Sequence, residues 1–479
     1  MMHLFVSLLQ KHFTEPTKIL QIHALLITSG FFLLPNPNQS HTIAFNCLIQ
    51  SYLRQRTPKP KPPDAPLRLF LQLLSFGAQP NHHTFPSLLK SSSSSPLIGT
   101  SIHGQTLRRG FVLDDFIGCS LIKFYAQLGR FLDAKKVFDE MPHPDLASCN
   151  AMLDVLCACH DMGAAYKFFQ SMSIRDIASW TTMINGFSKN GSYSSAIQLF
   201  RRLIHEGENV FAKIRPNEAT FVSVLSACAS LGDREGLAVG TEIHAHFIQR
   251  QIHLTAFLGT ALIDLYGKHG HLYSCENIFK AIIQKEVCTW NAMISALACN
   301  GGEENALQMF DRMQSDGVVP NHITLLAVLT ACSHAGLVDL GVQHFEAMVS
   351  KYGLTPLMKH YGCMVDLFGR AGLLHKAMNF IMQMPFEADE SVWGALFGSC
   401  KLHGNAELGA YVGQKLLNLE PWYGGWYKTL RNIYAEAGRW QNVVEMRENM
   451  NLTGAKMVAG KSYVNSTCTA GNPIQHHLI

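Results

Sequence analysis

The feature that most constrains this chain is a short mark that returns along most of its length. An aromatic or small apolar residue is followed four positions later by glycine, as in Tyr125–Gly129, Tyr266–Gly270 and Tyr434–Gly438. The marks and their equivalents lie 31 to 41 residues apart, at Gly129, His160, Gly191, Gly232, Gly270, Gly301, Gly336, Gly372, Gly404 and Gly438. Such a period is typical of stacked helix pairs and argues against a single globular core.

Inside one period the apolar residues follow helical spacing. In residues 287–321 they recur at i, i+3, i+4 and i+7 in two runs: Trp290, Met293, Ile294 and Leu297, then Ala306, Met309, Phe310 and Met313. Gly301 and Gly302 separate the runs, and Pro320 ends the second. One hairpin cannot bury its own apolar face. We therefore predict an all-α fold, a right-handed superhelical solenoid of stacked antiparallel helix hairpins.

Composition narrows the class of protein. The 479 residues are 47% hydrophobic and 15% charged, with a net charge of +4, which excludes a disordered chain and a generic basic arm for nucleic acids. The long runs without charged residues, 29–53 and 318–338, contain proline and asparagine, so we expect no membrane span. The 13 cysteines form no Cys-x-x-Cys pair and indicate free thiols in a reducing compartment.

The helix starts point to a family. Trp290–Ile294, Trp180–Ile184 and Phe45–Ile49 resemble the opening of pentatricopeptide repeats, and the Trp…Leu-Gly…Tyr pattern of tetratricopeptide repeats does not recur. The alternating lengths resemble the plant subclass that mixes standard, long and short repeats. Later segments resemble the "E" extension of RNA-editing factors, at Val392–Leu396, Asn432–Trp440 and Gly454–Val464.

This resemblance implies a division of the chain. We expect an N-terminal segment with a degenerate repeat at 1–41, a repeat array at 42–389, an E-type extension of repeat-like helices at 390–464 and a flexible tail at 465–479. The expected repeats of the array are 42–81, 82–114, 115–145, 146–176, 177–217, 218–255, 256–286, 287–321, 322–357 and 358–389. The extension divides into 390–423 and 424–464.

The resemblance also implies which residues read RNA bases, namely the fifth and the last of each repeat. The pairs are Asn46 with Asn81 for a pyrimidine, Asn150 with Asp176 for uracil, Thr181 with Asn217 for adenine, Asn291 with Asn321 for a pyrimidine with cytosine favoured, and Thr260 with Glu286 for no assigned base. Cys119 with Asp145 and Gly362 with Asp389 remain unassigned. The competing interpretation is that these polar residues are helix caps or surface groups.

Phosphate contact is expected at the thirteenth position of three repeats, where Lys189, Lys268 and Arg370 stand. The alternative is that each is a solvated helix end. Because the net charge is small, we expect binding to depend only weakly on salt.

The sequence favours an adaptor over an enzyme. His344–Glu346 lacks the Pro-Cys-x-x-Cys half of a zinc deaminase site, and Cys157–His160 has no second half. Ala455–Ser462 resembles a phosphate-binding loop without the flanking strand and helix. The chain ends at Gln475–Ile479, with no room for the deaminase domain that many relatives carry. We therefore expect no catalytic residue, no metal and no cofactor.

The function implied by the resemblance is recognition of single-stranded RNA in an organelle, the mitochondrion or alternatively the chloroplast. The chain would mark a site for C-to-U editing and recruit a deaminase-bearing or other editing factor in trans through residues 390–464. We expect a monomer without membrane attachment. The alternatives are an RNA stability or splicing factor, and a protein–protein scaffold of the tetratricopeptide type.

Overall fold

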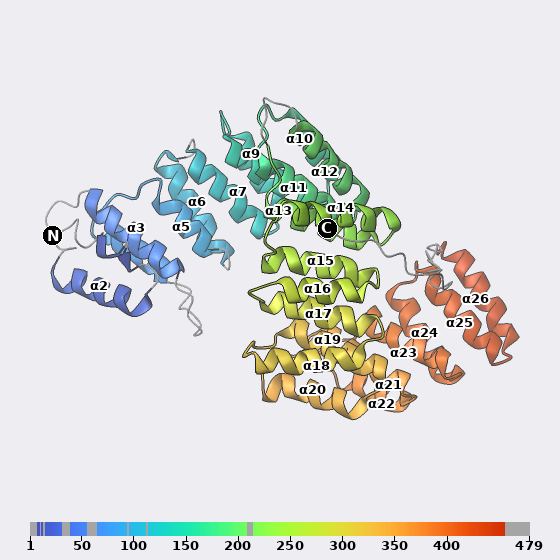
Figure 1. Cartoon of the computed structure of the whole chain (residues 1–479). Helices are drawn as coiled ribbons and strands as arrows, with labels where there is room; N and C mark the ends of the chain where they lie inside the picture. The colour runs from blue at the N-terminus through green and yellow to red at the C-terminus, as the bar shows by residue number, and fades with distance from the viewer. Residues whose placement is uncertain are drawn as a thin grey trace. The chain divides into compact units, whose positions relative to one another are not determined.

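A computed structural model describes residues 7–9, 11–12, 15–30, 39–54, 65–92, 95–111, 114–207 and 214–455. All regular elements in these ranges are helices (Figure 1). The expected tail at 465–479, and all of Ala455–Ser462 except its first residue, lie outside the described residues. The chain divides into two compact units, Met1–Ile252 and His253–Ile479.

In the first unit, α2 (Pro16–Thr28) precedes a series of consecutive helix hairpins. The paired helices are α3 (Gln39–Arg54) with α4 (Ala65–Ser75), α5 (Thr84–Ser91) with α6 (Pro96–Arg108), α7 (Asp115–Gln127) with α8 (Phe131–Asp139), α9 (Leu146–Ala158) with α10 (Met162–Ser171), α11 (Ile177–Lys189) with α12 (Tyr193–Gly207), and α13 (Glu218–Leu231) with α14 (Arg234–Gln249).

The second unit repeats the same arrangement. Its hairpins are α15 (Ala256–Lys268) with α16 (Leu272–Ala281), α17 (Val287–Cys299) with α18 (Glu303–Ser315), α19 (His322–Ala335) with α20 (Val338–Ser350), α21 (Met358–Arg370) with α22 (Leu374–Met382), α23 (Glu390–Leu402) with α24 (Ala406–Leu419), and α25 (Gly424–Glu436) with α26 (Trp440–Leu452).

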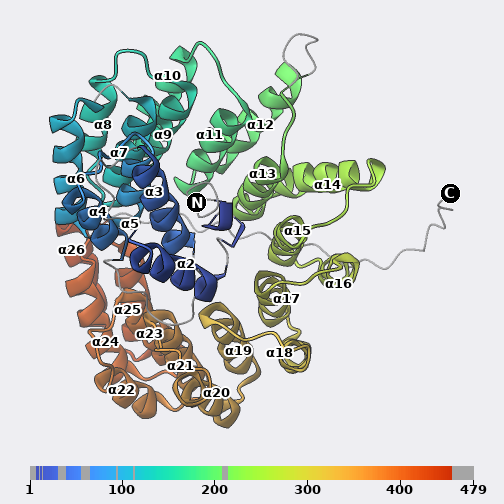
Figure 2. The same cartoon turned by 90° about the vertical axis from the view of Figure 1, so that its left-hand side faces the viewer.

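The first helices of successive hairpins pack on one another. In the first unit α7, α9 and α11 lie side by side, and in the second α15, α17 and α19 do (Figure 2). Equivalent positions of these helices therefore recur along one face of each unit. The predicted fold class, a solenoid of stacked antiparallel helix hairpins, is confirmed. The first helix of most predicted repeats begins at the repeat's first residue, although α3 begins at Gln39 rather than at residue 42.

The recurring mark is the turn inside each hairpin from α7–α8 to α25–α26. All of the marks have positive φ, from 61° at His160 to 77° at Gly301. An L-residue in this left-handed region costs roughly 1–2 kcal/mol, which is why glycine occupies the other marks. His160 is the exception, and its ring Nδ1 donates a short hydrogen bond to Asn190 Oδ1.

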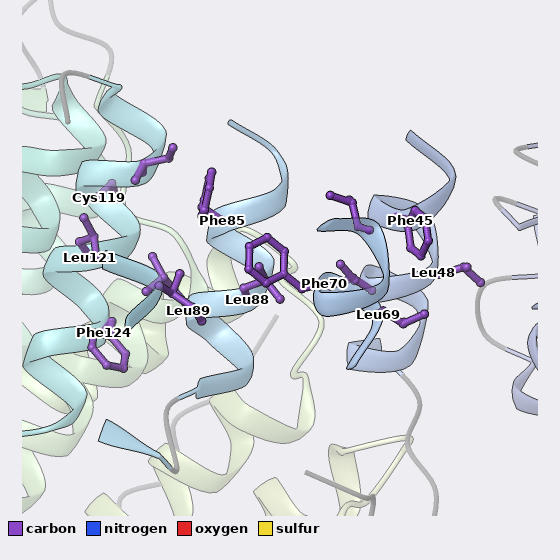
Figure 3. Packing of buried hydrophobic residues seen from close by; sticks show 14 of the residues in the cluster. Phe45, Leu48, Leu69, Phe70, Phe85, Leu88, Leu89, Cys119, Leu121 and Phe124 are labelled. Atoms are coloured by element: carbon purple, nitrogen blue, oxygen red, sulfur yellow. The ribbon is translucent and has the colours of Figure 1, made fainter. Parts of the chain in front are cut away.

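The core runs between the hairpins. In the first unit Phe45 from α3, Phe70 from α4, Phe85 from α5 and Phe124 from α7 belong to one buried cluster (Figure 3). Burial of each such side chain contributes about 1.5–3 kcal/mol to the free energy of folding. A change such as Phe85→Ala should therefore destabilise both repeats whose helices meet in this cluster. None of the described helices has the length and apolar content needed to cross a membrane.

Candidate functional site

The last residue of several repeats is the N-cap of the first helix that follows. Asp176 accepts the backbone N–H of Ser179 at 2.9 Å, Asn217 that of Thr220 at 3.0 Å, and Asn321 that of Thr324 at 3.0 Å. The competing interpretation is therefore correct for these terminal residues, since they do cap helices. It does not account for the fifth residues, which lie inside their own helices.

Three of the predicted pairs are joined directly. The Nδ2 of the fifth residue donates to Oδ1 of the last residue, at 2.9 Å from Asn46 to Asn81, 3.1 Å from Asn150 to Asp176 and 3.1 Å from Asn291 to Asn321. The partners are far apart in sequence and meet because adjacent first helices stack. Whether they read bases remains a prediction.

A third residue, which was not predicted from the sequence, completes two of these three sites; Asn46 Oδ1 is buried without a hydrogen-bond partner among the described residues. Ser179, the third residue of α11, donates its hydroxyl to Asn150 Oδ1 at 2.7 Å, and Thr324 of α19 donates to Asn291 Oδ1 at 2.6 Å. Both hydroxyls also accept the backbone N–H of the preceding N-cap residue. We call the fifth residue, the last residue and this third helix residue a reader triad. The capping-box spacing, Asn or Asp followed three positions later by Ser or Thr, could have revealed it.

The two threonine pairs behave differently. Thr181 bonds its own helix at Ile177 O, at 2.7 Å, and reaches Asn217 only through the Thr220 hydroxyl, 2.8 Å from Thr181 and 2.9 Å from Asn217. In the second unit Thr260 bonds Thr289 at 3.2 Å, and the exposed Glu286 makes no cap bond with its side chain. The structure thus links Thr181 with Asn217 indirectly and does not join Thr260 to Glu286.

The pair Asn150–Asp176 of the first unit opens onto a pocket. A hollow of about 860 Å³ is lined by residues of α7, α9 and α11 and by their N-caps, including Asn150, Asp176 and Asp145. Its charged lining consists of Lys123 and of the carboxylates of Asp145, Asp154 and Asp176. This excess of negative charge suits the polar edge of a base and repels a phosphate.

The hydrogen bonds decide which atoms remain for a ligand. Burial acts to raise the pKa of Asp176, but hydrogen bonds from Ser179 and Asn150 outweigh it and hold this pKa below its ordinary value, so the group is a carboxylate at neutral pH. Its Oδ1 receives the bonds from Asn150 and Ser179, which leaves Oδ2 as an acceptor. At Asn321, Oδ1 is likewise occupied, which leaves the amide Nδ2 as a donor.

The proposed phosphate ligands are not equivalent. Lys268 Nζ lies 3.1 Å from Asp264 Oδ2, and Arg370 Nε lies 2.8 Å from Asp366 Oδ2. Each is an exposed ion pair between residues four positions apart on one helix. Lys189 has Asn185 in place of that carboxylate and is exposed. Of the three, Lys189 therefore offers the least compensated charge, and the phosphate role of all three stays a prediction.

The other motifs lie in the hydrophobic core or at turns. Burial raises the pKa of the Cys157 thiol to about 12, which suits a neutral core residue. His344 packs edge-on against Phe310, with ring centroids 5.5 Å apart, and burial lowers the pKa of its imidazole. Among the described residues, no group of three or more His, Cys, Asp or Glu side chains is arranged to hold a metal ion.

Comparison with protein families assigns both parts of the chain. Residues 403–465 match the E motif, and residues 285–334 match the PPR repeat family. The PPR repeat itself matches at residues 119–143, 147–177, 178–208, 260–287 and 359–386.

Full-length relatives and solved structures agree. A putative pentatricopeptide repeat-containing protein of Arabidopsis thaliana is 44% identical over 95% of this chain and 96% of its own length. A chloroplastic relative of that plant is 31% identical over 84% of this chain and 67% of its own length, and a mitochondrial one is 32% identical over 76% of each.

Among solved structures, the pentatricopeptide repeat protein PPR10 from maize superposes with a TM-score of 0.55 at 14% identity, over 95% of this chain and 64% of that one. PPR10 in complex with an 18-nt psaJ RNA element gives a TM-score of 0.60 at 14% identity, over 95% of this chain and 65% of that one. This likeness concerns the fold alone. On the strength of the repeats, the E motif and a relative that is 44% identical over 96% of its length, the chain belongs to the pentatricopeptide repeat family.

Proposed function

We propose that this protein binds single-stranded RNA and selects its sequence one base per repeat. The observation that supports the proposal is the reader triad, in which a polar pair is held by a buried hydroxyl and opens onto a pocket. A rigid pair of this kind loses little side-chain entropy when a base binds, so its hydrogen bonds can discriminate between bases.

The remaining atoms give the selectivity a physical basis. Uracil has an N3–H donor, which fits the free Oδ2 acceptor of Asp176. Cytosine has an N3 acceptor, which fits the free Nδ2 donor of Asn321. The choice of Asp or Asn at the end of a repeat would therefore decide between the two pyrimidines, because the fifth residue is Asn in both triads.

The biological role rests on coarser support. The E motif and the relatives named as chloroplastic or mitochondrial favour an organellar RNA factor, and we place the protein in the mitochondrion. The repeats would hold the transcript beside a cytidine that is converted to uridine. The deaminase would act in trans, recruited through residues 390–464, while this chain, a monomer, supplies recognition without catalysis, metal or cofactor.

A gel-shift series tests RNA recognition. With one base per repeat, read 5′ to 3′ in chain order, the triads predict the target 5′-YNNUANNC-3′. The full chain should bind this RNA at least about 10-fold more tightly than an RNA in which the central U and A are exchanged, because two repeats would then face the wrong base and one lost hydrogen bond alone corresponds to about 10-fold. Equal affinity for both RNAs at moderate salt would refute base readout and favour a protein scaffold. Transcript sequencing of a plant lacking the protein separates editing from stability or splicing.

A further inference from the structure

The three positions of the reader triad continue into the extension with different chemistry. In residues 390–423 the fifth residue is Gly394, the last residue is Tyr423, which is the N-cap of α25, and the third residue of α25 is Trp426. These are the places that Asn291, Asn321 and Thr324 occupy in the array. The polar triad is thus replaced by a bare backbone and two aromatic rings.

Two glycines make room for these rings. A Cβ added at Gly394 would lie 3.1 Å from the indole of Trp426, so the ring lies against the backbone where a reader side chain would stand. A Cβ added at Gly425 would lie 2.4 Å from the ring of Tyr423, so this ring covers the start of α25. The Tyr423 and Trp426 rings lie 5.0 Å apart at 63°, and Trp426 Nε1 donates to Glu420 Oε2 at 3.0 Å.

The surface around these rings is open to solvent. Tyr423 is 38% exposed and its neighbour Trp422 is 65% exposed. Lys428, the fifth residue of the segment 424–464, is exposed on the same helix, two residues after Trp426. The carboxylate of Glu420 accepts the indole N–H of Trp426. We call Trp422, Tyr423 and Trp426 the aromatic platform.

Aromatic rings beside a cation are the usual means of holding single-stranded RNA without reading its sequence. Every base has a π-face, and stacking on an aromatic side chain contributes roughly 1–3 kcal/mol per base. The platform also occupies the register in which a repeat would present its readers, through the contact of Trp426 with Gly394, although α25 packs mainly on α24 and only lightly on α23 (Figure 1).

We propose that the aromatic platform stacks the nucleobase that follows the RNA segment read by the array. This inference rests on the proposed RNA binding and assigns to the extension an RNA contact of its own, beside any partner that it recruits. The platform would hold the strand without sequence preference and fix the path of the RNA as it leaves the repeats.

The test uses the full chain and an RNA that carries 5′-YNNUANNC-3′, then two nucleotides facing the repeats 322–357 and 358–389, and then 2-aminopurine facing residues 390–423. Stacking on the rings should quench the 2-aminopurine fluorescence. Replacing that nucleotide by an abasic one should weaken binding about 10-fold, within the range for loss of one stacked base. The double variant Trp422→Ala/Tyr423→Ala should show neither the quenching nor the abasic penalty, and Trp422→Ala alone should reduce both.

Trp440→Ala is the matched control, because Trp440 is 66% exposed but lies on α26, outside the platform. It should behave as the unmodified chain does. If the array still prefers U-A over A-U but the abasic RNA binds equally well and no quenching appears, the platform is wrong, its rings serve a protein partner, and the proposed function stands. If the U-A preference is absent as well, both proposals fail.

Discussion

Reciprocal exchange of the terminal residue in two repeats gives the sharpest test of the reader triad. Asp176→Asn should convert the repeat 146–176 from uracil to cytosine, and Asn321→Asp should convert the repeat 287–321 from cytosine to uracil. The reason is the side-chain atom of the last residue that makes no hydrogen bond within the triad. Asp176 keeps Oδ2 as an acceptor, Asn321 keeps Nδ2 as a donor, and the fifth residue is Asn in both repeats.

The size of the effect follows from one hydrogen bond made or lost at the base edge. Such a bond contributes about 0.5–1.5 kcal/mol when both partners are neutral and about 1.5–3 kcal/mol when one is charged. Since 1.4 kcal/mol corresponds to a factor of ten, each exchange should shift the C/U preference roughly 10-fold. Stability should change little, because Asn and Asp are about equally good N-caps.

The assay is competition binding with RNAs that differ only in C or U opposite the altered repeat. Asp389→Asn is the control, since Asp389 also caps a helix, at 3.0 Å from Val392 N, but its repeat has Gly362 at the fifth position. It should alter affinity for all RNAs equally. The reasoning is refuted if both exchanges move the preference in the same direction, which a general effect of charge would produce.

Four further outcomes follow from the structure. Thr324→Val should destabilise the protein by about 2–3 kcal/mol in urea unfolding, because loss of the fully buried hydroxyl leaves Asn291 Oδ1 and the Asn321 N–H without a partner. Thr324→Ser keeps the hydroxyl and should not destabilise the protein. His160→Gly should stabilise it by about 1 kcal/mol by removing a side chain at φ 61°, and no rise in thermal midpoint would contradict this. Lys189→Ala should lower the slope of log affinity against log salt by about 0.7, and an unchanged slope would show that Lys189 faces no phosphate. Burial lowers the pKa of five histidines below the ordinary 6.5: His23, His103, His244, His344 and His360. Because the unfolded chain binds protons at these residues before the folded chain does, the folded state is fully favoured above pH 6.5 and less favoured as the pH falls through 6.5. The thermal midpoint should therefore drop between pH 7.5 and 5.5, and a flat profile would contradict the lowered pKa values.

The repeat period and the helical spacing sufficed to predict the fold. A period near 34 residues leaves room for two helices and two turns, and the left-handed turn residue marks each hairpin so regularly that His160 could be placed by spacing alone. Exact starts were harder, as at α3, because its first residues, Gln39–His41, are polar or aromatic and carry no apolar pattern.

The site was predicted only in part. The Asn pairs could be named from the resemblance, but the buried hydroxyls of Ser179 and Thr324 could not, because a hydroxyl three residues into a helix is usually explained by its own cap. The two threonine pairs are not joined directly because the threonine side chain is too short. The Thr hydroxyl sits one atom closer to the backbone than the Asn amide, so Thr181 reaches its own helix and Thr220 but not Asn217.

The ion pairs at the thirteenth position could have been anticipated. Asp264 and Asp366 stand four residues before Lys268 and Arg370, a spacing at which opposite charges meet on a helix. At these two positions RNA would therefore meet little positive charge, because a carboxylate neutralises each cation.

The double duty of the last residue limits what a repeat can read. That residue must cap the next helix, so a residue that both caps well and offers a free polar atom is restricted to Asn, Asp, Ser or Thr. Where the cap comes from elsewhere, the restriction is lifted. At the end of 322–357 the N-cap is Leu357, and the ring Nδ1 of His360 accepts its N–H at 3.0 Å while Nε2 donates to His322 O at 2.9 Å. The position can then be apolar, as here, or aromatic, as at Tyr423. On this argument, restoring a reader at this repeat requires three changes, Asn in place of Leu326 at the fifth position, a polar cap at Leu357 and a hydroxyl at His360, and the first two alone would leave the new side chains without their support.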